Sequence, residues 1–318
     1  MKIVIPDDYQ DMIHRLDAFK LLAGHEVTRY RAPARDFAEL VERLSPAECV
    51  VEIRERIDFS RALIERLPNL KLIALVGSRS RAIDYAAAAE CGVKVSRGAS
   101  GSPEAPAELA VALMLAARRN VVIEAPRMQR GDWPCTLSYR LRGSTLGIFG
   151  LGHIGRLVAE AGRGLGMNVL VWGRENSLAA ARAAGYETAA SKQALFERAD
   201  VLQLLVRLSD DTRGIVTAAD LARMKPTALF VNVARAELIE KGALVAALER
   251  GRPGFAAVDV YDQEPIIGGN HPLLKMPNVL CTPHLGWAEW DTFELYFREC
   301  FEQIVNYAAG KPLRLAGA

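Results

Sequence analysis

The stretch TLGIFGLGHIG, residues 145–155, decides the fold of this chain. Its first five residues are apolar and partly β-branched, which is typical of a buried parallel strand. Gly150, Gly152 and Gly155 follow with the spacing G-x-G-x-x-G, and the residues after them have the pattern of a helix. In this context the first glycine permits a sharp turn, the second lets the backbone approach a pyrophosphate, and the third lets helix and strand pack closely. The stretch therefore predicts a dinucleotide-binding turn with the phosphates at the helix N-terminus; the alternative is a glycine-rich structural turn.

Strand-like and helical segments alternate on both sides of this turn. Strands are expected at residues 2–5, 26–30, 49–53, 70–76, 93–95, 145–149, 168–172, 200–206, 228–233, 256–260 and 279–281. Helices are expected at residues 11–22, 36–44, 60–67, 85–91, 107–119, 153–164, 177–184, 191–198, 218–224, 240–250 and 288–309. Such alternation predicts parallel sheets with helices on both faces, in two α/β units. Residues 97–106 have the composition of a linker, and residues 127–142 are expected to form an extended arm.

The composition indicates a globular protein. With 318 residues, 50% of them hydrophobic, the chain can bury a core in each of about two domains. Its net charge of +2 does not favour nucleic acid or a membrane surface as a partner. The five cysteines are scattered without C-x-x-C spacing, which argues against a disulfide framework or a zinc site, and we expect no metal. The N-terminal residues lack the pattern of a signal peptide and no run reaches the about 18 apolar residues of a membrane span, so we expect a cytoplasmic protein.

Three chemically useful side chains follow the last three expected strands. They are Arg235, Glu264 and His284. Ligands bind at the carboxyl ends of the strands in sheets of this kind, so these side chains are expected to share one edge. Each also has a structural interpretation: an arginine on the surface, a glutamate in a turn before Pro265, and a histidine in a structural role. Together with the glycine turn they predict one site.

Several segments carry a resemblance to a known family. The specific matches are GLGHIG (150–155), MKPTALFVNVARAELIE (224–240), GFAAVDVYDQEP (254–265) and HPLLKMPNVLCTPHLGW (271–287), with looser matches in PNLKLIALVG (68–77) and PAELAVALMLAARR (106–119). Over essentially its full length the chain resembles the D-isomer-specific 2-hydroxyacid dehydrogenase family, which includes phosphoglycerate dehydrogenases and glyoxylate/hydroxypyruvate reductases.

The resemblance implies an α/β fold of two doubly wound parallel-sheet domains, with a Rossmann cofactor domain inserted into a flavodoxin-like substrate domain. The substrate-binding domain would comprise residues 1–98 and 286–318, and the dinucleotide-binding domain residues 99–285. The long C-terminal helix would return to the first domain. The implied activity is an oxidoreductase that transfers a hydride between NAD(P)H and a small 2-keto acid to give the D-2-hydroxy acid, reversibly.

The resemblance also implies catalytic roles. Arg235 would bind the substrate carboxylate and polarise the keto oxygen, which suits a planar, always-charged guanidinium. His284 would give a proton to the keto oxygen, because imidazole titrates near neutral pH. Glu264 would hydrogen-bond His284, orient its ring and favour its charged form. Substrate contacts are implied for Val76, Gly77, Ser78, Arg235 and His284.

The implied cofactor contacts lie mostly at the glycine turn and after the following strands. They are Gly150, Gly152, His153, Ile154, Gly155, Arg174, Val206, Thr212, Val233, Ala234, Asp259 and Gly286. Asp259 would face the nicotinamide carboxamide.

The sequence departs from the family pattern at the end of the expected strand 168–172. Many members have an acidic residue there, which binds the ribose hydroxyls of the cofactor. Here Gly173 takes its place and Arg174 follows. A guanidinium favours a 2′-phosphate over a free hydroxyl, so NADP is slightly favoured over NAD. Glu175 is close and could take the ribose role instead.

A second departure lies in the substrate loop, where members often carry G-x-G-x-D. This chain has GSRSR at residues 77–81. Arg79 and Arg81, together with Arg54, could contact a second anionic group on the substrate. The alternative is that these arginines are solvated surface residues.

Two other functions remain open at this point. One is a non-catalytic nicotinamide-sensing, partner-binding module on the same fold, against which the intact Arg235, Glu264 and His284 weigh. The other is a methyltransferase that uses the glycine turn differently, which the segment around His284 disfavours. The resemblance further implies a homodimer built on the cofactor domain, with the arm around Trp133 packing on the partner subunit.

Overall fold

The computed structural model describes residues 1–99 and 101–317, and the chain divides into two compact units. Unit 2 comprises Pro103–Ala288, and unit 1 comprises the segments that precede and follow it. Unit 2 is thus inserted into unit 1. The two boundaries fall after residues 102 and 288, and the resemblance implied boundaries after residues 98 and 285.

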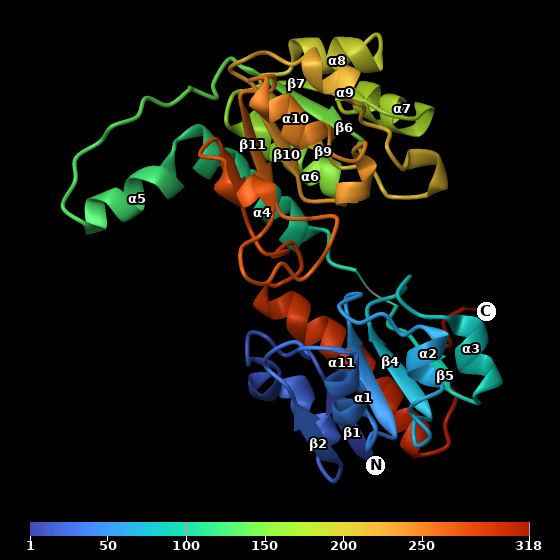
Figure 1. Ribbon diagram of the computed structural model, residues 1–318. Coiled ribbons are helices and arrows are strands. Elements are labelled where there is room, and N and C mark those ends of the chain that lie inside the picture. Colours follow the sequence, from blue (N-terminus) through green and yellow to red (C-terminus); the bar gives the residue numbers. More distant parts are fainter. Residues whose placement is uncertain (100, 318) are drawn as a thin grey trace. The chain divides into compact units, whose positions relative to one another are not determined.

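Unit 1 is built on a five-stranded parallel sheet of order β2-β1-β3-β4-β5 (Figure 1). Its strands are β1 Lys2–Ile5, β2 Glu26–Arg29, β3 Cys49–Ile53, β4 Leu72–Val76 and β5 Lys94–Ser96. Its helices are α1 Phe37–Leu44, α2 Arg61–Ile64, α3 Tyr85–Glu90 and α11 Trp290–Ala308. This strand order is the flavodoxin-like form of the doubly wound fold, as predicted. The C-terminal helix α11 packs against β4 of the same unit.

The α-helix expected at residues 11–22 is wrong. The segment forms two 3₁₀ helices, η1 Ile13–Arg15 and η2 Asp17–Leu22, because Leu16 between them is extended with ψ 142°. The backbone N–H of Ala18 donates to the Glu294 carboxylate of α11 at 2.8 Å, so a tertiary contact takes the place of a local helical bond. Helical spacing alone did not reveal this contact, which comes from far along the sequence.

Unit 2 is built on a seven-stranded parallel sheet of order β12-β11-β10-β9-β6-β7-β8 (Figure 1). Its strands are β6 Thr145–Phe149, β7 Asn168–Trp172, β8 Glu187–Thr188, β9 Val201–Leu204, β10 Leu229–Asn232, β11 Phe255–Val258 and β12 Val279–Cys281. Its helices are α4 Glu104–Arg118, α5 Val121–Gln129, α6 His153–Gly164, α7 Glu175–Ala183, α8 Lys192–Arg198, α9 Ala218–Ala222 and α10 Ala243–Glu249. Short 3₁₀ helices are η3 Asp210–Thr212, η4 Ala236–Leu238 and η5 Pro272–Lys275. The strand order reverses between β6 and β9, as in the predicted Rossmann fold.

One strand and one α-helix of unit 2 were not expected from the sequence. Strand β8 has only two residues and pairs with β7 at the sheet edge. Helix α5 occupies residues that follow the expected helix 107–119 and reaches into the expected arm, so only the part of the arm beyond Gln129 is irregular. A proline at position 126 concealed this helix, because proline inside a helix removes a hydrogen bond. In Figure 1, α5 and the chain after it project away from the sheet of unit 2.

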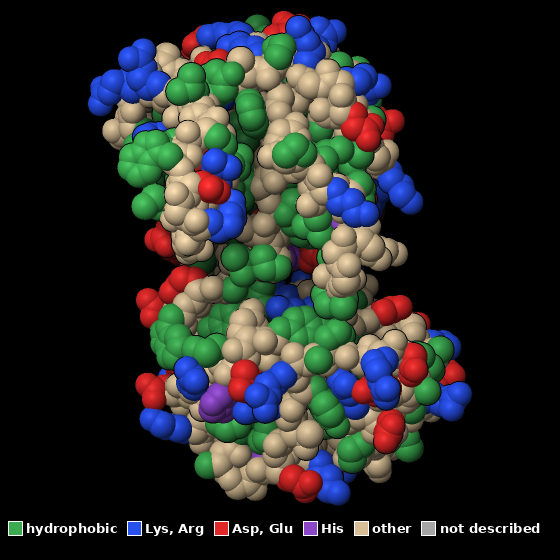
Figure 2. Space-filling model, turned by 60° about the vertical axis from the view of Figure 1, so that its left-hand side comes forward, with side chains coloured by type: hydrophobic (Ala, Val, Ile, Leu, Met, Phe, Trp, Pro, Cys, Tyr) green, Lys and Arg blue, Asp and Glu red, His purple; other side chains and the backbone are tan. Residues whose placement is uncertain are grey.

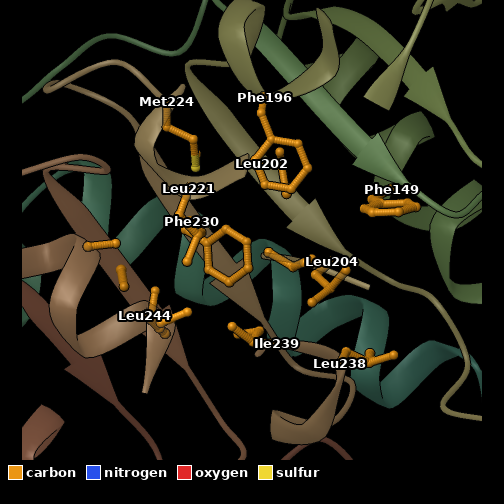
Figure 3. Close-up of a cluster of buried hydrophobic side chains, with 14 of the residues drawn as sticks. Phe149, Phe196, Leu202, Leu204, Leu221, Met224, Phe230, Leu238, Ile239 and Leu244 are labelled. Carbon is orange, nitrogen blue, oxygen red and sulfur yellow. The ribbon is translucent and has the colours of Figure 1, made fainter. Parts of the chain in front are cut away.

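Both faces of the unit 2 sheet are buried. On one face Phe149, Phe196 and Phe230 point into the same cluster, with the Phe149 and Phe196 rings edge to face at 6.4 Å between centroids (Figure 3). On the other face the helices α4 and α6 pack over the sheet. Close packing of this kind fixes the strands, and with them the carboxyl ends from which the functional loops start.

Acidic and basic side chains are interspersed on the surface shown in Figure 2. The chain has 40 Lys and Arg against 38 Asp and Glu, so the balance seen there reflects the whole sequence. Among the described residues, no helix combines the length with the apolar composition that crossing a membrane requires.

Candidate active site

The glycine turn connects β6 to α6 and requires glycine at two positions. Gly150 has φ +98°, and a Cβ there would lie 3.0 Å from the carbonyl oxygen of Leu205. A Cβ on Gly155 would lie 2.3 Å from the carbonyl oxygen of Gly150, so any side chain would force helix and strand apart. Gly152 is the N-cap of α6 and, being glycine, has no side chain to bond the free N–H groups there. Within residues 1–99 and 101–317, nothing lies within 4 Å of a Cβ at Gly152, and this open space beside the helix N-terminus fits a pyrophosphate.

The next strand, β7, ends beside this turn. The N–H of Gly150 donates to the Trp172 carbonyl at 2.8 Å, and the N–H of Leu151 donates to Ser177 Oγ at 3.2 Å. Arg174 is the N-cap residue of α7, and its side chain is 74% exposed. Its guanidinium lies 3.6 Å from the Asp211 carboxylate, which is 85% exposed. An exposed pair at this distance contributes little energy, so the guanidinium stays available to a stronger anion.

Glu264 and His284 are bonded to each other at the far end of the same sheet edge. His284 Nδ1 lies 2.5 Å from Glu264 Oε2, and the two side chains are 20% and 28% exposed. The second carboxylate oxygen of Glu264 accepts the backbone N–H of Tyr261 at 2.9 Å. The carboxylate is therefore held by its own loop while it orients the imidazole ring.

The charges around Glu264 keep it ionised. Burial acts to raise the pKa of Glu264, but the bond to His284, the charge of His284, the Tyr261 N–H and the charge of Arg235 outweigh it and leave the pKa lowered. Glu264 is thus a carboxylate near neutral pH.

Asp259 holds the loop that carries His284. Asp259 is fully buried and accepts three hydrogen bonds: from Thr282 Oγ1 at 2.6 Å, from the Leu285 N–H at 2.7 Å and from the Gly286 N–H at 2.8 Å. Burial raises the pKa of Asp259 in spite of these bonds. His284 has φ +53°, an uncommon conformation for a residue with a side chain, and the bonds to Asp259 on both sides of it stabilise that conformation.

Arg235 lies on the chain that leaves β10. Its side chain is half-buried, and its Nη1 donates to the Ala234 carbonyl at 2.7 Å. Asn232, the last residue of β10, bonds to the backbone on both sides of this position. The three predicted catalytic side chains therefore all lie on the carboxyl edge of one sheet, after β10, β11 and β12.

The other predicted cofactor contacts differ in their burial and in the contacts that they already make. Val206, Val233 and Ala234 follow β9 and β10, and Val206 closes over Gly150. Thr212 is only 4% exposed, and its hydroxyl donates to the Arg207 carbonyl at 2.7 Å, so this hydroxyl is already used to shape its own loop. His153 and Ile154 form the first turn of α6, His153 exposed and Ile154 packed on the core.

Of the predicted substrate residues, Val76 is the last residue of β4 in unit 1, and Gly77 and Ser78 follow it. The carbonyl of Gly77 accepts the Gly98 N–H at 2.8 Å, and Ser78 is exposed. Arg54 Nη1 would lie 3.4 Å from a Cβ on Gly77, so this guanidinium is next to the loop. Arg79 and Arg81 are both exposed.

Sequence reasoning missed three residues that support the site. Asn232 bonds to the Arg235 loop, and Tyr261 bonds to the Glu264 carboxylate. Thr282 bonds the loop of His284 to Asp259. Tyr261 also donates its hydroxyl to the Thr282 carbonyl at 2.9 Å and so connects two of these loops. A signal was available for Asn232, because a polar residue at the end of an apolar strand needs a partner. No pattern in the sequence identifies that partner.

Comparisons with known proteins agree with this geometry. Residues 111–286 match the family model "D-isomer specific 2-hydroxyacid dehydrogenase, NAD binding domain". The chain is 32% identical over 289 residues to glycerate dehydrogenase of Methylorubrum extorquens, with 88% of each chain covered. It is 32% identical over 293 residues to glyoxylate reductase of Aeropyrum pernix, covering 89% of this chain and 86% of the relative. A crystal structure of phosphoglycerate oxidoreductase from Vibrio cholerae is 47% identical with a TM-score of 0.94, covering 98% of this chain and 99% of that one. The chain therefore belongs to the D-isomer specific 2-hydroxyacid dehydrogenase family, as its motifs predicted, and is an NAD(P)-dependent oxidoreductase of that family.

Proposed function

We propose that Arg235, Glu264 and His284 are the catalytic residues of a reversible reduction of a small 2-keto acid to the D-2-hydroxy acid. The observation that carries this proposal is the 2.5 Å contact between Glu264 and His284 on the sheet edge that also bears Arg235. A proton donor, a group that keeps it charged and a cation for the substrate are what this chemistry requires of the protein.

His284 would exchange the proton. Its Nδ1 faces Glu264, so Nε2 is the ring nitrogen left for the substrate. The imidazolium would donate its Nε2 proton to the keto oxygen during reduction, and the neutral ring would take the proton back from the hydroxyl during oxidation. The Glu264 carboxylate would stabilise the charged ring in both directions.

Arg235 would bind the substrate carboxylate and polarise the keto oxygen. A guanidinium has five N–H donors in a planar fork, and the internal bond to Ala234 uses one of them. The backbone of Val76, Gly77 and Ser78 is the proposed substrate contact from unit 1.

The glycine turn would bind the cofactor. Gly150, Gly152 and Gly155, with His153 and Ile154, would place the uncapped N-terminus of α6 at the pyrophosphate. When bound, the nicotinamide cofactor supplies the hydride for reduction and accepts it in oxidation. The remaining proposed contacts are Arg174, Val206, Thr212, Val233, Ala234, Asp259 and Gly286. Asp259 would contact the nicotinamide carboxamide while it holds the His284 loop.

We infer a preference for NADP from Arg174. An Arg174→Ala variant lacks the exposed guanidinium after β7. Its KM for NADPH is expected to rise about tenfold, which corresponds to the loss of one hydrogen bond to a charged group. The KM for NADH is expected to stay within about twofold. The control is Arg182→Ala, another exposed arginine of the same helix, which pairs with Glu175. An unchanged KM for NADPH in the Arg174 variant would remove the preference.

We propose a homodimer in which α5 and the following arm pack on a partner subunit. These residues expose large apolar side chains: Val121 is 50% exposed, Met128 61%, Trp133 77% and Leu137 95%. Apolar surface gathered on one projecting segment marks an interaction site. Sedimentation equilibrium should give twice the chain mass of 34.8 kDa, and a monomer at micromolar concentration would contradict the proposal.

The activity is tested by mixing the protein with NADH or NADPH and a panel of keto acids. The relatives named above motivate glyoxylate and hydroxypyruvate, to which pyruvate and phenylpyruvate are added. The expected result is loss of reduced-cofactor absorbance with at least one of them, and a D-configured product. Cofactor binding with no turnover on the whole panel would favour a sensor and overturn the proposal.

A further inference from the structure

We propose that Asn232 is a positioning residue, which fixes the loop that carries Arg235 and thereby the direction of its guanidinium. The proposal rests on the proposed role of Arg235 as the residue that binds the substrate carboxylate. It assigns a function to a buried amide that bonds to the backbone of Ala234 and Arg235.

The backbone of Asn232 is held in the sheet by its neighbours. It is the last residue of β10, which lies between β9 and β11 in the sheet, and it pairs with Leu204 on one side and Val258 on the other. Its own carbonyl accepts the Asp259 N–H at 3.0 Å. The residue is 1% exposed. Its side chain therefore starts from a backbone position that the sheet holds on both sides.

The amide of Asn232 bonds to both ends of the dipeptide that carries the guanidinium. Its Oδ1 accepts the Ala234 N–H at 3.0 Å, and its Nδ2 donates to the Arg235 carbonyl at 2.9 Å. A backbone N–H only donates and a carbonyl only accepts, so these partners fix which way the amide faces. The first bond is an Asx-turn, a local interaction in which asparagine directs its own backbone. The second bond extends this control to the residue that carries the cation.

A purely structural role does not require asparagine at this place. The residues in register with Asn232 across the sheet are Leu204, Val258 and Cys281, all apolar or nearly so. An apolar side chain would fill the same buried position without the cost of burying an amide. Holding residues 234 and 235 in one conformation requires a side chain that has both a donor and an acceptor. Precise placement of a binding group matters because a shift of about 1 Å can cost a large factor in rate.

The experiment measures oxamate binding by calorimetry in the presence of saturating NADH. Oxamate carries the carboxylate of a 2-keto acid but does not accept a hydride. In Asn232→Ala both bonds are lost, and oxamate is expected to bind about tenfold more weakly, the equivalent of one or two hydrogen bonds. In Asn232→Ser the hydroxyl can still accept the Ala234 N–H but cannot reach the Arg235 carbonyl, so an intermediate affinity is expected. The Asn232 side chain also holds Ala234, a proposed cofactor contact, so NADH affinity is measured for each variant and oxamate binding is compared only at saturating NADH.

The matched control is Gln203→Ala. Gln203 is a fully buried amide in the neighbouring strand β9, and its Nε2 donates to the Ala110 carbonyl at 3.1 Å, away from the Arg235 loop. This variant is expected to unfold at a lower temperature and yet bind oxamate like the unaltered protein. If Asn232→Ala behaves in the same way, less stable with unchanged oxamate affinity, the inference is wrong. If Asn232→Ala does not fold, the Asn232→Ser variant decides the question by the same criterion.

A third variant separates this inference from the function on which it rests. Arg235→Lys keeps the charge and removes the planar fork, so it should weaken oxamate binding at least as much as Asn232→Ala. If Arg235→Lys binds oxamate normally, the proposed role of Arg235 fails. If Arg235→Lys loses affinity while both Asn232 variants keep it, Arg235 retains its role and Asn232 does not position it.

Discussion

Replacing His284 with glutamine is expected to lower kcat for keto-acid reduction by about 10²- to 10⁴-fold, the usual contribution of a general acid. Glutamine fills a similar volume, and its amide can still donate to the Glu264 carboxylate that lies 2.5 Å from Nδ1 in the unaltered protein. It has no proton to release near neutral pH. The loop should stay in place, because the bonds to Asp259 come from Thr282 and from the backbone of the residues after His284.

The measurement is steady-state reduction of the best keto acid of the panel, together with cofactor affinity from the fluorescence of the reduced nicotinamide. Cofactor affinity is expected to be unchanged within about twofold. His271→Gln is the matched control, since this histidine lies in the same unit and caps η5 by accepting the Leu273 N–H. A His284→Gln variant that retains more than a tenth of the original kcat would refute the proton-transfer role.

The parts of the site that sequence could predict are those with local or topological causes. The glycine turn follows from sterics, because Gly150 has φ +98° and Gly155 leaves no room for a Cβ. The common edge of Arg235, Glu264 and His284 follows from parallel topology, since each residue comes soon after a strand of one sheet. Neither conclusion requires knowledge of the loops.

The hydrogen bonds that support the site could not be predicted from the sequence, because they depend on the path of the chain between helices and strands. Asp259 was expected only as a contact of the nicotinamide, and the structure adds that it accepts three hydrogen bonds from the His284 loop. Those partners lie more than twenty residues away in the sequence. The left-handed backbone conformation of His284 could not be predicted for the same reason. A histidine adopts φ +53° only where its surroundings in the folded protein stabilise it.

Replacing Glu264 with glutamine should change the pH dependence of the reaction as well as its rate. The bond to His284 can survive, because the amide carbonyl can accept from Nδ1–H as the carboxylate does. The negative charge is lost, and with it the electrostatic stabilisation of the imidazolium. We expect kcat for reduction at neutral pH to fall by about 10²-fold. This loss is smaller than the largest loss expected when His284, the general acid, is replaced.

The direction of the pH effect follows from which form of His284 each reaction needs. Reduction needs the protonated ring. The attraction to the charge of His284 that lowers the pKa of Glu264 is mutual and favours the charged ring, so the alkaline limb of the reduction profile should move to lower pH in Glu264→Gln. Oxidation needs the neutral ring, so the acidic limb of the oxidation profile should also move to lower pH, and oxidation at neutral pH should lose less rate than reduction.

Asp262→Asn is the matched control: it removes an exposed carboxylate two residues away from Glu264, and it should leave both limbs in place. The lowered pKa of Glu264 keeps it ionised throughout this range, so it contributes no limb of its own to the profile of the unaltered protein. Equal losses in the two directions with unmoved limbs would mean that Glu264 only orients the ring and that its charge plays no part in the proton transfer.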